Sequence, residues 1–411
     1  MNSNIGDQQF WKNFAKFSWE KKAVLAKKFK SPVQEIDQDK IFSMLVNYSD
    51  RCRKLKSADG FKLYIDGHRQ NDAEILQILP IRKDKSLQNY HRRMEEIFTD
   101  YCLICDELLQ ASQEDWDKLR NFTKNLFSHV GLPNRFAEMG LYLGNYRQTP
   151  FGVHVDGCGV FSFPVVGKKV FRLWKPAFAK KHPELAYADQ YTKLKKDSKT
   201  LQCLPGDMAY WPSSAWHIAE SDGSFSATWS LGIWVDRTHQ DVIEDTLRPL
   251  IKSKLGPLGQ EKIINWSEPQ QSGQIKKLPK NFLQTISVIK NMTKNQLYDV
   301  FLKSWLEHSS KEGFKNFPAA GPKLRITFQS RIQLISYQKI LWANLKSEKK
   351  TIYAFQETIT EAQPSKGFQK LIKHLNQGKS CLIADYLKGS SRNRDLQLLQ
   401  ALSSSVELTS N

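Results

Sequence analysis

The stretch Thr149-Pro-Phe-Gly-Val-His-Val-Asp156 carries a histidine and an aspartate one residue apart, and a lone histidine, His217, follows much later in the chain. We expect residues 152–156 to form a strand. Because alternate side chains of a strand point to the same face, His154 and Asp156 would then both reach one metal ion. His217 would complete the site from a distant strand brought alongside.

The segments around these residues alternate as further strands do, and we predict strands at residues 160–166, 170–174, 208–211 and 226–235. Two imidazole nitrogens and one carboxylate oxygen on one face of a metal, with the opposite face open, are the ligand set of non-haem Fe(II) oxygenases. A His-x-Asp triplet also occurs by chance in many chains of this length. Its surroundings therefore decide how it is interpreted.

The segment before the second histidine reads Leu204-Pro-Gly-Asp-Met-Ala-Tyr-Trp-Pro-Ser-Ser-Ala-Trp-His217, a turn, a short apolar strand and a proline-containing turn. It resembles the Gly-Asp-x-x-Tyr-x-Pro-x-x-x-Trp-His block of the JmjC and cupin-like 2-oxoglutarate oxygenases. Upstream, Leu141-Tyr-Leu-Gly-Asn-Tyr-Arg-Gln-Thr-Pro-Phe-Gly-Val-His154 resembles the strand and turn that enter the first metal motif of that family. The resemblance covers roughly residues 10–235, and its specific motifs lie within residues 141–235.

This resemblance implies an Fe(II) ion held by His154, Asp156 and His217, with 2-oxoglutarate and O2 as cosubstrates. Lys169 resembles the basic residue of the family that pairs with the distal carboxylate of 2-oxoglutarate, an interaction in which a buried cation faces a carboxylate. Lys168 competes for this role. Strand alternation places the two lysines on opposite faces, so only one of them can point into the barrel.

Two further side chains are carried over from the family as cosubstrate contacts. Thr149 resembles the hydroxyl that helps to hold the same carboxylate, although its spacing to the first histidine differs from that of the asparaginyl hydroxylase branch. Ser230 stands at the place of a polar residue that lines the cosubstrate pocket in relatives; alternatively, it is an ordinary inward-facing strand serine. Three aromatic residues are candidates for the pocket wall, although strand aromatics also form cores: Tyr142, Tyr146 and Trp216.

Length and composition place the chain among globular proteins. Its 411 residues predict about two or three domains, and 40% of the residues are hydrophobic. The net charge of +19 favours an acidic partner or nucleic acid, or else a solvated basic surface, since the lysines are dispersed. The sequence contains no run of about 18 apolar residues that would predict a membrane span. Residues 1–10 are too polar for a signal peptide. We therefore expect a cytoplasmic protein.

The six cysteines are scattered without a disulfide framework, which agrees with a reducing compartment. Cys102 and Cys105 form a Cys-x-x-Cys pair. The chain has no second pair at zinc spacing, and the surrounding segment is mostly apolar. We therefore expect these two side chains to pack in the core.

We predict an α+β fold whose first domain, residues 1–236, is a double-stranded β-helix (jelly-roll, cupin/JmjC) with a helical surround. Helical segments are expected at residues 36–46, 87–109 and 116–130, and a strand at residues 61–65. These elements would enclose the barrel that carries the metal motifs.

Residues 237–310 are predicted to form a helical linker region. Helices are expected at residues 240–255 and 281–308, and a linker rich in Gly, Pro, Ser and Gln at residues 254–280. In bacterial and ribosomal relatives the helices after the barrel commonly make a dimer contact. By analogy, this region is a candidate for homodimer formation.

Residues 311–411 are predicted to form a small winged-helix-like domain, which resembles the C-terminal module of ribosomal oxygenases. The expected elements are strands at 324–328 and 351–355, followed by helices at 365–375, at 381–387 with Ser380 as its cap, and at 394–402. Basic side chains leave a recognition role open beside a scaffolding or dimer-stabilising role: Lys366, Lys370, Lys373, Lys379, Lys388, Arg392 and Arg394.

The resemblance implies an Fe(II)/2-oxoglutarate-dependent dioxygenase that hydroxylates a side chain of a protein or peptide and converts 2-oxoglutarate to succinate. Retention of Asp156 favours hydroxylation over halogenation, while demethylation of a methylamine stays open. The substrate candidates are a ribosomal protein and a ribosomally made precursor peptide. Two other classes are kept as alternatives: a cupin-fold binding protein, and a nucleic-acid-binding regulator that uses the basic C-terminal unit.

Overall fold

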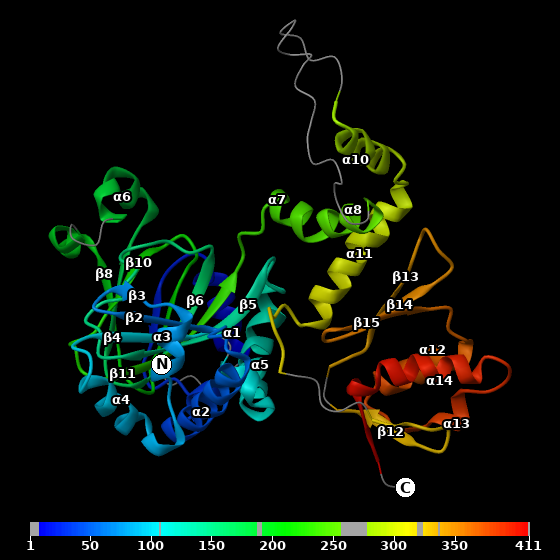
Figure 1. Ribbon diagram of the computed structural model, residues 1–411, viewed down its shortest axis with the longest axis horizontal. Helices are drawn as coiled ribbons and strands as arrows, with labels where there is room; N and C mark the ends of the chain where they lie inside the picture. Colours follow the sequence, from blue (N-terminus) through cyan, green and yellow to red (C-terminus); the bar gives the residue numbers. More distant parts are fainter. Residues whose placement is uncertain are drawn as a thin grey trace, which may run out of the picture. The chain divides into compact units, whose positions relative to one another are not determined.

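The computed structural model describes residues 8–106, 108–186, 191–255, 278–318, 324–335 and 338–409 (Figure 1). The chain divides into two compact units. The first unit comprises Met1–Asp236 and Gly313–Ala319, and the second comprises Arg237–Glu312 and Ala320–Asn411.

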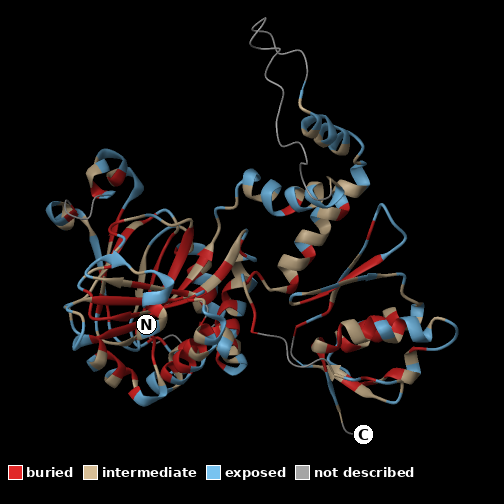
Figure 2. Cartoon of the chain, viewed as in Figure 1, coloured by how far each residue is buried: buried red, intermediate tan, exposed pale blue. Residues whose placement is uncertain are grey.

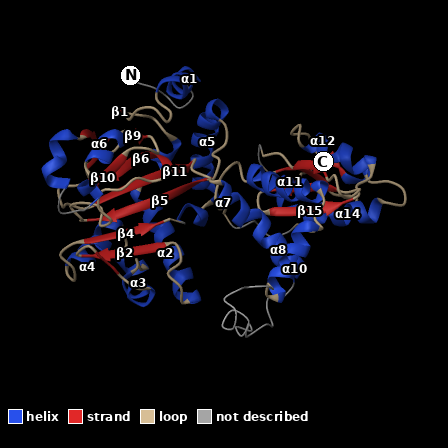
Figure 3. Ribbon diagram, turned by 90° about the horizontal axis from the view of Figure 1, so that it is seen from above, coloured by secondary structure: helices blue, strands red, loops and turns tan. Residues whose placement is uncertain are grey.

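Two antiparallel sheets form the centre of the first unit. The larger sheet has the strand order β1-β9-β6-β11-β5-β4-β2-β3, and the smaller has the order β10-β7-β8. Figure 3 shows most strands of the larger sheet side by side. The strands are β1 (Val24–Ala26), β2 (Phe61–Ile65), β3 (His68–Arg69), β4 (Tyr101–Cys105), β5 (Phe136–Gly144), β6 (Cys158–Val166), β7 (Lys169–Trp174), β8 (Lys199–Cys203), β9 (Met208–Trp211), β10 (Trp216–Glu220) and β11 (Ser226–Trp234).

Helices pack on the large sheet of the first unit through interlocked aromatic rings. The ring of Phe122 lies 5.2 Å from that of Trp11 and 5.3 Å from that of Phe161 on β6. Such edge-to-face pairs add to the burial of apolar surface. Helix α6 (Pro176–Lys181) and the 3-10 helices at Pro183–Ala186 and Tyr191–Asp197 pack instead with β7 and β10 of the smaller sheet. The other helices of the unit are α1 (Gln8–Phe17), α2 (Gln38–Leu55), α3 (Asp72–Ile78), α4 (Leu87–Glu95) and α5 (Gln113–Val130), with short 3-10 helices at Pro32–Glu35, Arg82–Asp84 and Leu108–Ala111.

Strand β11 lies between β5 and β6 and pairs antiparallel with both along nearly its whole length. Its alternate residues separate two environments. Ala227, Trp229, Leu231 and Ile233 are fully buried in the main core. Figure 2 shows buried stretches along the strands of the first unit. The intervening side chains point to the opposite face of the sheet, toward the smaller sheet. This second face forms the floor of the pocket described below.

The second unit combines helices with two three-stranded antiparallel sheets, β16-β12-β17 and β13-β14-β15. Its main core packs α12 and α14 against β12 and β14. The helices are α7 (His239–Val242), a π-helical turn at Ile243–Leu247, α8 (Arg248–Leu255), α10 (Lys280–Lys290), α11 (Lys294–Ser310), α12 (Lys366–Leu375), α13 (Ile383–Tyr386), α14 (Arg392–Ala401) and a 3-10 helix at Ser403–Ser405; the strands are β12 (Arg331–Leu334), β13 (Leu341–Asn344), β14 (Thr351–Phe355), β15 (Thr358–Ala362), β16 (Cys381–Leu382) and β17 (Val406–Leu408).

The predicted helix at residues 87–109 is wrong in its second half. The helix ends at Glu95, and β4 follows as five consecutive buried residues. Cys102 and Cys105 are three residues apart on this strand, so they face opposite sides of the sheet and pack in different clusters. Both are free and buried, which confirms the core interpretation.

Other expectations fail where local chemistry breaks the pattern. Residues 324–328 form no strand, and the helix predicted at 381–387 begins only at Ile383, with Leu382 rather than Ser380 at its N-cap. The helical region 281–308 is two helices, because the Thr293 side chain caps a new start at α11. Most of the linker predicted at 254–280 lies outside the described residues. Among the described helices, none is long and apolar enough to cross a membrane.

Candidate functional site

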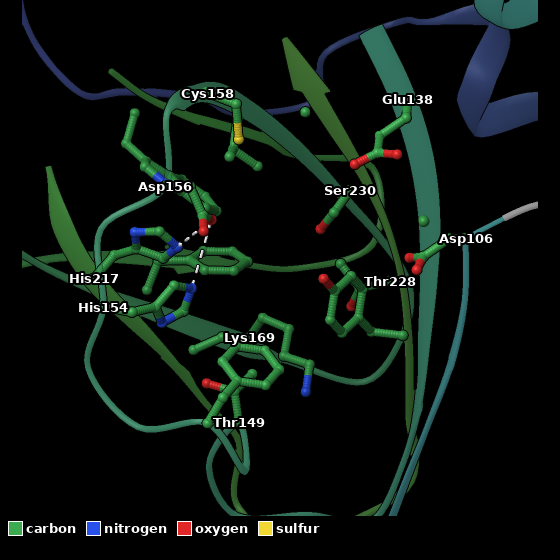
Figure 4. Close-up of a pocket in the computed structure, with 18 of the residues that line it drawn as sticks. Asp106, Glu138, Thr149, His154, Asp156, Cys158, Lys169, His217, Thr228 and Ser230 are labelled. Atoms are coloured by element: carbon green, nitrogen blue, oxygen red, sulfur yellow. Dashed lines mark ion pairs between the residues drawn. The ribbon is translucent and has the colours of Figure 1, made fainter. Parts of the chain in front are cut away.

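A pocket opens between the two sheets of the first unit (Figure 4). Its floor comes from alternate residues of β5 and β11, and its walls come from β6, β7, β9, β10 and the loop before β6. The lining residues are Asp106, Glu138, Gly140, Tyr142, Tyr146, Thr149, Phe151, His154, Asp156, Cys158, Val160, Lys169, Phe171, Trp211, His217, Ala219, Thr228, Ser230, Gly232 and Trp234.

The structure brings His154, Asp156 and His217 together on one side of this pocket. One ligand atom from each residue lies within 4.8 Å of the other two. Oδ2 of Asp156 is 3.5 Å from Nε2 of His154 and 3.6 Å from Nε2 of His217. Two imidazoles and one carboxylate at this spacing can converge on one ion.

The strand predicted at residues 152–156 is wrong, because His154 makes only an isolated bridge to β10. The backbone N–H of His154 donates to the carbonyl of His217 at 3.1 Å, and the reverse bond measures 2.8 Å. A turn closed by the Gly152 N–H and the Thr149 carbonyl precedes this bridge, with Gly152 at φ +70°. A curved loop therefore presents His154 and Asp156, while β10 presents His217 as predicted.

The outer ring nitrogens of both histidines are held by backbone carbonyls. Nδ1 of His154 lies 3.0 Å from the Gly152 carbonyl oxygen, and Nδ1 of His217 lies 3.1 Å from that of Ala215. Such bonds fix the tautomer that leaves Nε2 free to bind a metal. Burial, together with the neighbouring His154, lowers the pKa of His217 to about 4, so this imidazole is neutral at physiological pH. A neutral ring is the form that coordinates metals.

Lys169, the first residue of β7, points into the same pocket and is only 1% exposed. Its Nζ has no hydrogen-bond partner among the described residues and lies 3.7 Å from the ring centre of Tyr146. Burial lowers the pKa of Lys169 to about 7. Lys168 is exposed, so the structure places Lys169 inward and Lys168 outward.

Unpartnered polar atoms gather in this pocket. Thr149 Oγ1, Thr228 Oγ1 and Trp211 Nε1 are buried there and lack hydrogen-bond partners among the described residues. An unsatisfied buried polar group costs about 1–3 kcal/mol. A ligand that pairs with Lys169 and accepts from the neighbouring hydroxyl groups would remove that cost, and the donor set therefore fits a metal-bound carboxylate compound.

The remaining predicted residues are placed differently. Ser230 lines the pocket with its Oγ 3.5 Å from that of Ser162, and Tyr142 and Tyr146 also line it. Trp216, the first residue of β10, does not line the pocket but packs against a separate hydrophobic cluster. The sequence reasoning missed other lining residues, of which the acidic ones are Asp106 and Glu138.

Comparison with known proteins agrees with the fold. Residues 117–241 match the family model described as the JmjC domain. The crystal structure of the Escherichia coli ribosomal oxygenase YcfD is 14% identical, with a TM-score of 0.51 over 97% of this chain and 98% of that chain. The structure of YcfD in complex with cobalt and 2-oxoglutarate is also 14% identical, with a TM-score of 0.50 and the same coverage. No curated protein matches the sequence. Residues 117–241 therefore match a JmjC domain, and the solved structures of YcfD share the fold of this chain.

Proposed function

We propose that this chain is an Fe(II)/2-oxoglutarate-dependent dioxygenase that hydroxylates a side chain of a protein or peptide and converts 2-oxoglutarate to succinate. The observation that carries this proposal is the meeting of two imidazoles, one carboxylate and a buried lysine in one pocket. The ligand atoms of His154, Asp156 and His217 lie within 4.8 Å of one another, and the Lys169 amine in the same cavity has no hydrogen-bond partner in the part of the chain that the structure describes.

In this proposal each side chain has a stated task. His154, Asp156 and His217 hold the iron, and the carbonyl bonds to their outer nitrogens keep the histidine rings in place. Lys169 pairs with the distal carboxylate of 2-oxoglutarate, and the hydroxyl of Thr149 donates to the same group. Ser230 would line the cosubstrate pocket. When bound, iron and 2-oxoglutarate activate O2 for insertion of one oxygen atom into a C–H bond.

The pocket walls support a reaction sheltered from water. Trp211, Trp234 and Tyr142 line the cavity and limit the access of solvent to the reacting atoms. Asp156 as a ligand leaves no coordination position for chloride, and we therefore propose hydroxylation and not halogenation. The same oxygen insertion at an N-methyl group would release that methyl group.

For the substrate, we propose a protein or peptide side chain. The E. coli protein of similar fold is named a ribosomal oxygenase, which makes a ribosomal protein a candidate here. A ribosomally made precursor peptide is the second candidate, with its leader held by the winged-helix-like C-terminal unit. We place the reaction in the cytoplasm, where both candidates are made.

A nucleic-acid-binding role for the C-terminal unit is favoured by one observation. Seven basic side chains, for which the sequence leaves a recognition role open beside a scaffolding or dimer-stabilising role, are all exposed: Lys366, Lys370, Lys373, Lys379, Lys388, Arg392 and Arg394. If these side chains contact phosphates, binding of the full chain to RNA or DNA weakens steeply as salt rises. Replacing Lys370, Lys373 and Arg394 with Gln would then lower the salt slope, whereas no binding at low salt would remove this role.

The decisive experiment measures Fe(II) and 2-oxoglutarate binding without oxygen, followed by succinate release in air. Wild type should bind both and release succinate slowly even without substrate. His154→Ala and Asp156→Ala should lose succinate release. His182→Ala is a matched control, because His182 pairs with Glu184 outside the pocket. If the wild-type chain binds neither iron nor 2-oxoglutarate, the oxygenase function is contradicted, and the alternative is that the barrel serves as a binding scaffold.

A further inference from the structure

Between α1 and β1 the chain passes through a turn in which Glu20 adopts a left-handed backbone conformation, with φ at +50°. Residues with a Cβ rarely adopt this conformation, because the Cβ is then crowded by the backbone. It persists only where surrounding contacts hold the residue in place. The hydrogen bonds of Glu20 show which part of the molecule supplies those contacts.

The carboxylate of Glu20 accepts hydrogen bonds from the chain between β9 and β10. The Ser213 N–H donates to it, at 3.3 Å from Oε1 and 3.2 Å from Oε2, and the Ser213 hydroxyl donates to Oε2. The Tyr210 hydroxyl donates to Oε1 at 3.1 Å and accepts from the Glu20 N–H at 2.9 Å. Hydrogen bonds to an ionised acceptor are stronger than those between neutral groups. Glu20 therefore fixes the turn of residues 212–215 that follows β9.

This turn leads directly to the metal-binding histidine of β10. The Ala215 N–H donates to the Pro212 carbonyl at 3.0 Å and closes the turn. The carbonyl oxygen of Ala215 lies 3.1 Å from Nδ1 of His217. A partner of this kind sets the tautomer and the orientation of a metal-binding imidazole. A displacement of the turn would therefore move the atom that holds the His217 ring.

The Glu20 carboxylate is also confined by β6, while the Tyr210 ring packs in the core. The space that a Cβ at Gly159 would need is occupied by this carboxylate, since that Cβ would lie 2.6 Å from Oε1 of Glu20. The fully buried ring of Tyr210 lies 4.8 Å from that of Phe14 on α1. Ring packing stabilises the fold, whereas the hydrogen bonds of Ser213 fix the turn. Substitutions can therefore separate the two effects.

We propose that Glu20 is a positioning residue for the metal centre, because it holds the turn of residues 212–215 and thereby the Ala215 carbonyl that orients His217. This inference rests on the proposed oxygenase function, since the metal that His217 would bind is the one that the reaction needs. Glu20 lies outside residues 117–241, which match the JmjC domain. The segment before the barrel thus contributes to the metal centre as well as to the core.

The first measurement is the Co(II) affinity of the metal-free, full-length chain, followed by titration calorimetry without oxygen. Glu20→Ala should lower the affinity about tenfold, since loss of a partner behind a metal ligand costs about 10–100-fold. Glu20→Gly should lower it equally, although this variant should unfold at a higher temperature than Glu20→Ala, because glycine adopts a left-handed φ without strain. Glu20→Gln keeps an acceptor for the Ser213 N–H and should restore part of the affinity.

Hydrogen exchange gives a second readout that needs no metal. In the metal-free chain, the amide of Ser213 should exchange faster in Glu20→Ala than in wild type, because it has lost its acceptor. Phe14→Leu is the matched control. It removes a ring that packs on Tyr210 and should lower the stability of the fold, but it leaves the Glu20 carboxylate in place. Its Co(II) affinity should equal that of wild type.

The proposal is overturned if Glu20→Ala binds Co(II) as tightly as wild type, or if its Ser213 amide exchanges no faster. It is also overturned if affinity follows stability across the four variants, because Glu20 would then only stabilise the fold. A wild-type chain that binds Co(II) but consumes no 2-oxoglutarate would contradict the proposed function and leave the role of Glu20 intact. An active wild type beside a Glu20→Ala variant of unchanged affinity would contradict this inference alone, and a wild type that binds no Co(II) would contradict both.

Discussion

At the scale of single residues, the buried amine of Lys169 has no hydrogen-bond partner among the described residues. It is 1% exposed, and burial lowers its pKa to about 7. If Lys169 pairs with the distal carboxylate of 2-oxoglutarate, the bound state requires the charged form. Above pH 7 the free protein must therefore take up a proton when the cosubstrate binds.

We predict that the affinity for 2-oxoglutarate is constant below about pH 7 and falls roughly tenfold per pH unit above it. Titration calorimetry in buffers of different ionisation enthalpy would detect the proton uptake. Lys169→Arg keeps the charge at all these pH values and should flatten the profile. Lys168→Met, which changes the exposed neighbour, should leave the profile as in wild type. A wild-type affinity that does not change between pH 7 and 9 would contradict the assignment of Lys169.

The same burial predicts a gain in stability when the charge is removed. The pKa of Lys169 is about 7 in the folded chain, and its ordinary value is 10.5. The unfolded state therefore binds more protons between these values, so wild-type stability rises with pH across this window and the full penalty applies below pH 7. Lys169→Met should raise the free energy of unfolding of the ligand-free chain by a few kcal/mol, since a tenfold change in the protonation equilibrium corresponds to about 1.4 kcal/mol. Urea unfolding should show the higher free energy of unfolding of Lys169→Met at pH 7, and the difference from wild type should decline toward pH 10.5. A variant less stable than wild type at pH 7 would argue against a buried charge at Lys169.

At the scale of secondary-structure elements, the contact between β4 and β5 depends on one glycine. Gly144 ends β5 at φ +149°, and a Cβ there would collide with the backbone carbonyl oxygen of Tyr101 on β4. We expect Gly144→Ala to destabilise the first unit by ~3 kcal/mol or more, since neither backbone can yield cheaply. Gly67→Ala is the control, because Gly67 also has a positive φ, +80°, but nothing lies within 4 Å of its Cβ position. In thermal unfolding, Gly144→Ala should lower the unfolding temperature much more than Gly67→Ala. Equal losses of stability would show that the positive φ angle, and not the collision with Tyr101, causes the loss.

The sequence predicted the strands whose two faces meet different environments. On β11, core residues such as Trp229 alternate with pocket residues such as Ser230, and this period of two is visible in the sequence. On β4 all five residues are buried, so the strand resembles a short apolar run. Such a run cannot be told from a buried helix by periodicity alone. For this reason the second half of the helix predicted at residues 87–109 was wrong, whereas its first half is α4.

In the site too, residues in local sequence motifs could be predicted, whereas a residue placed by strand pairing could not. His154, Asp156 and Lys169 stand in motifs with recognisable spacing, and the structure brings them into one pocket. Glu138 could have been found from the alternation of β5, where it shares a face with Tyr142. Asp106 could not, because its place in the pocket depends on the pairing of β4 with β5, which no local pattern records.

At the scale of the whole molecule, the second unit has large apolar side chains that are exposed to solvent in the single chain. On α10, Phe282, Leu283, Ile286 and Ile289 are each between 50% and 54% exposed. Their spacing places them along one face of the helix. Contiguous exposed apolar residues of this kind mark an interaction surface. A second copy of the same chain is a partner that is always present, which supports the homodimer expected for this region.

We therefore predict that the full-length chain is a dimer in solution and that this face of α10 forms part of the contact. In a two-fold symmetric interface each substitution acts twice, so Phe282→Lys with Ile286→Lys should place four charges in the apolar contact and shift the chain to monomer. Gln284→Lys adds a charge at an exposed polar position of the same helix and should leave the dimer intact. Sedimentation velocity over a range of concentrations would decide. If the wild-type chain stays monomeric, or if the control dissociates as completely as the double variant, the apolar face of α10 is not the dimer contact and binds another partner.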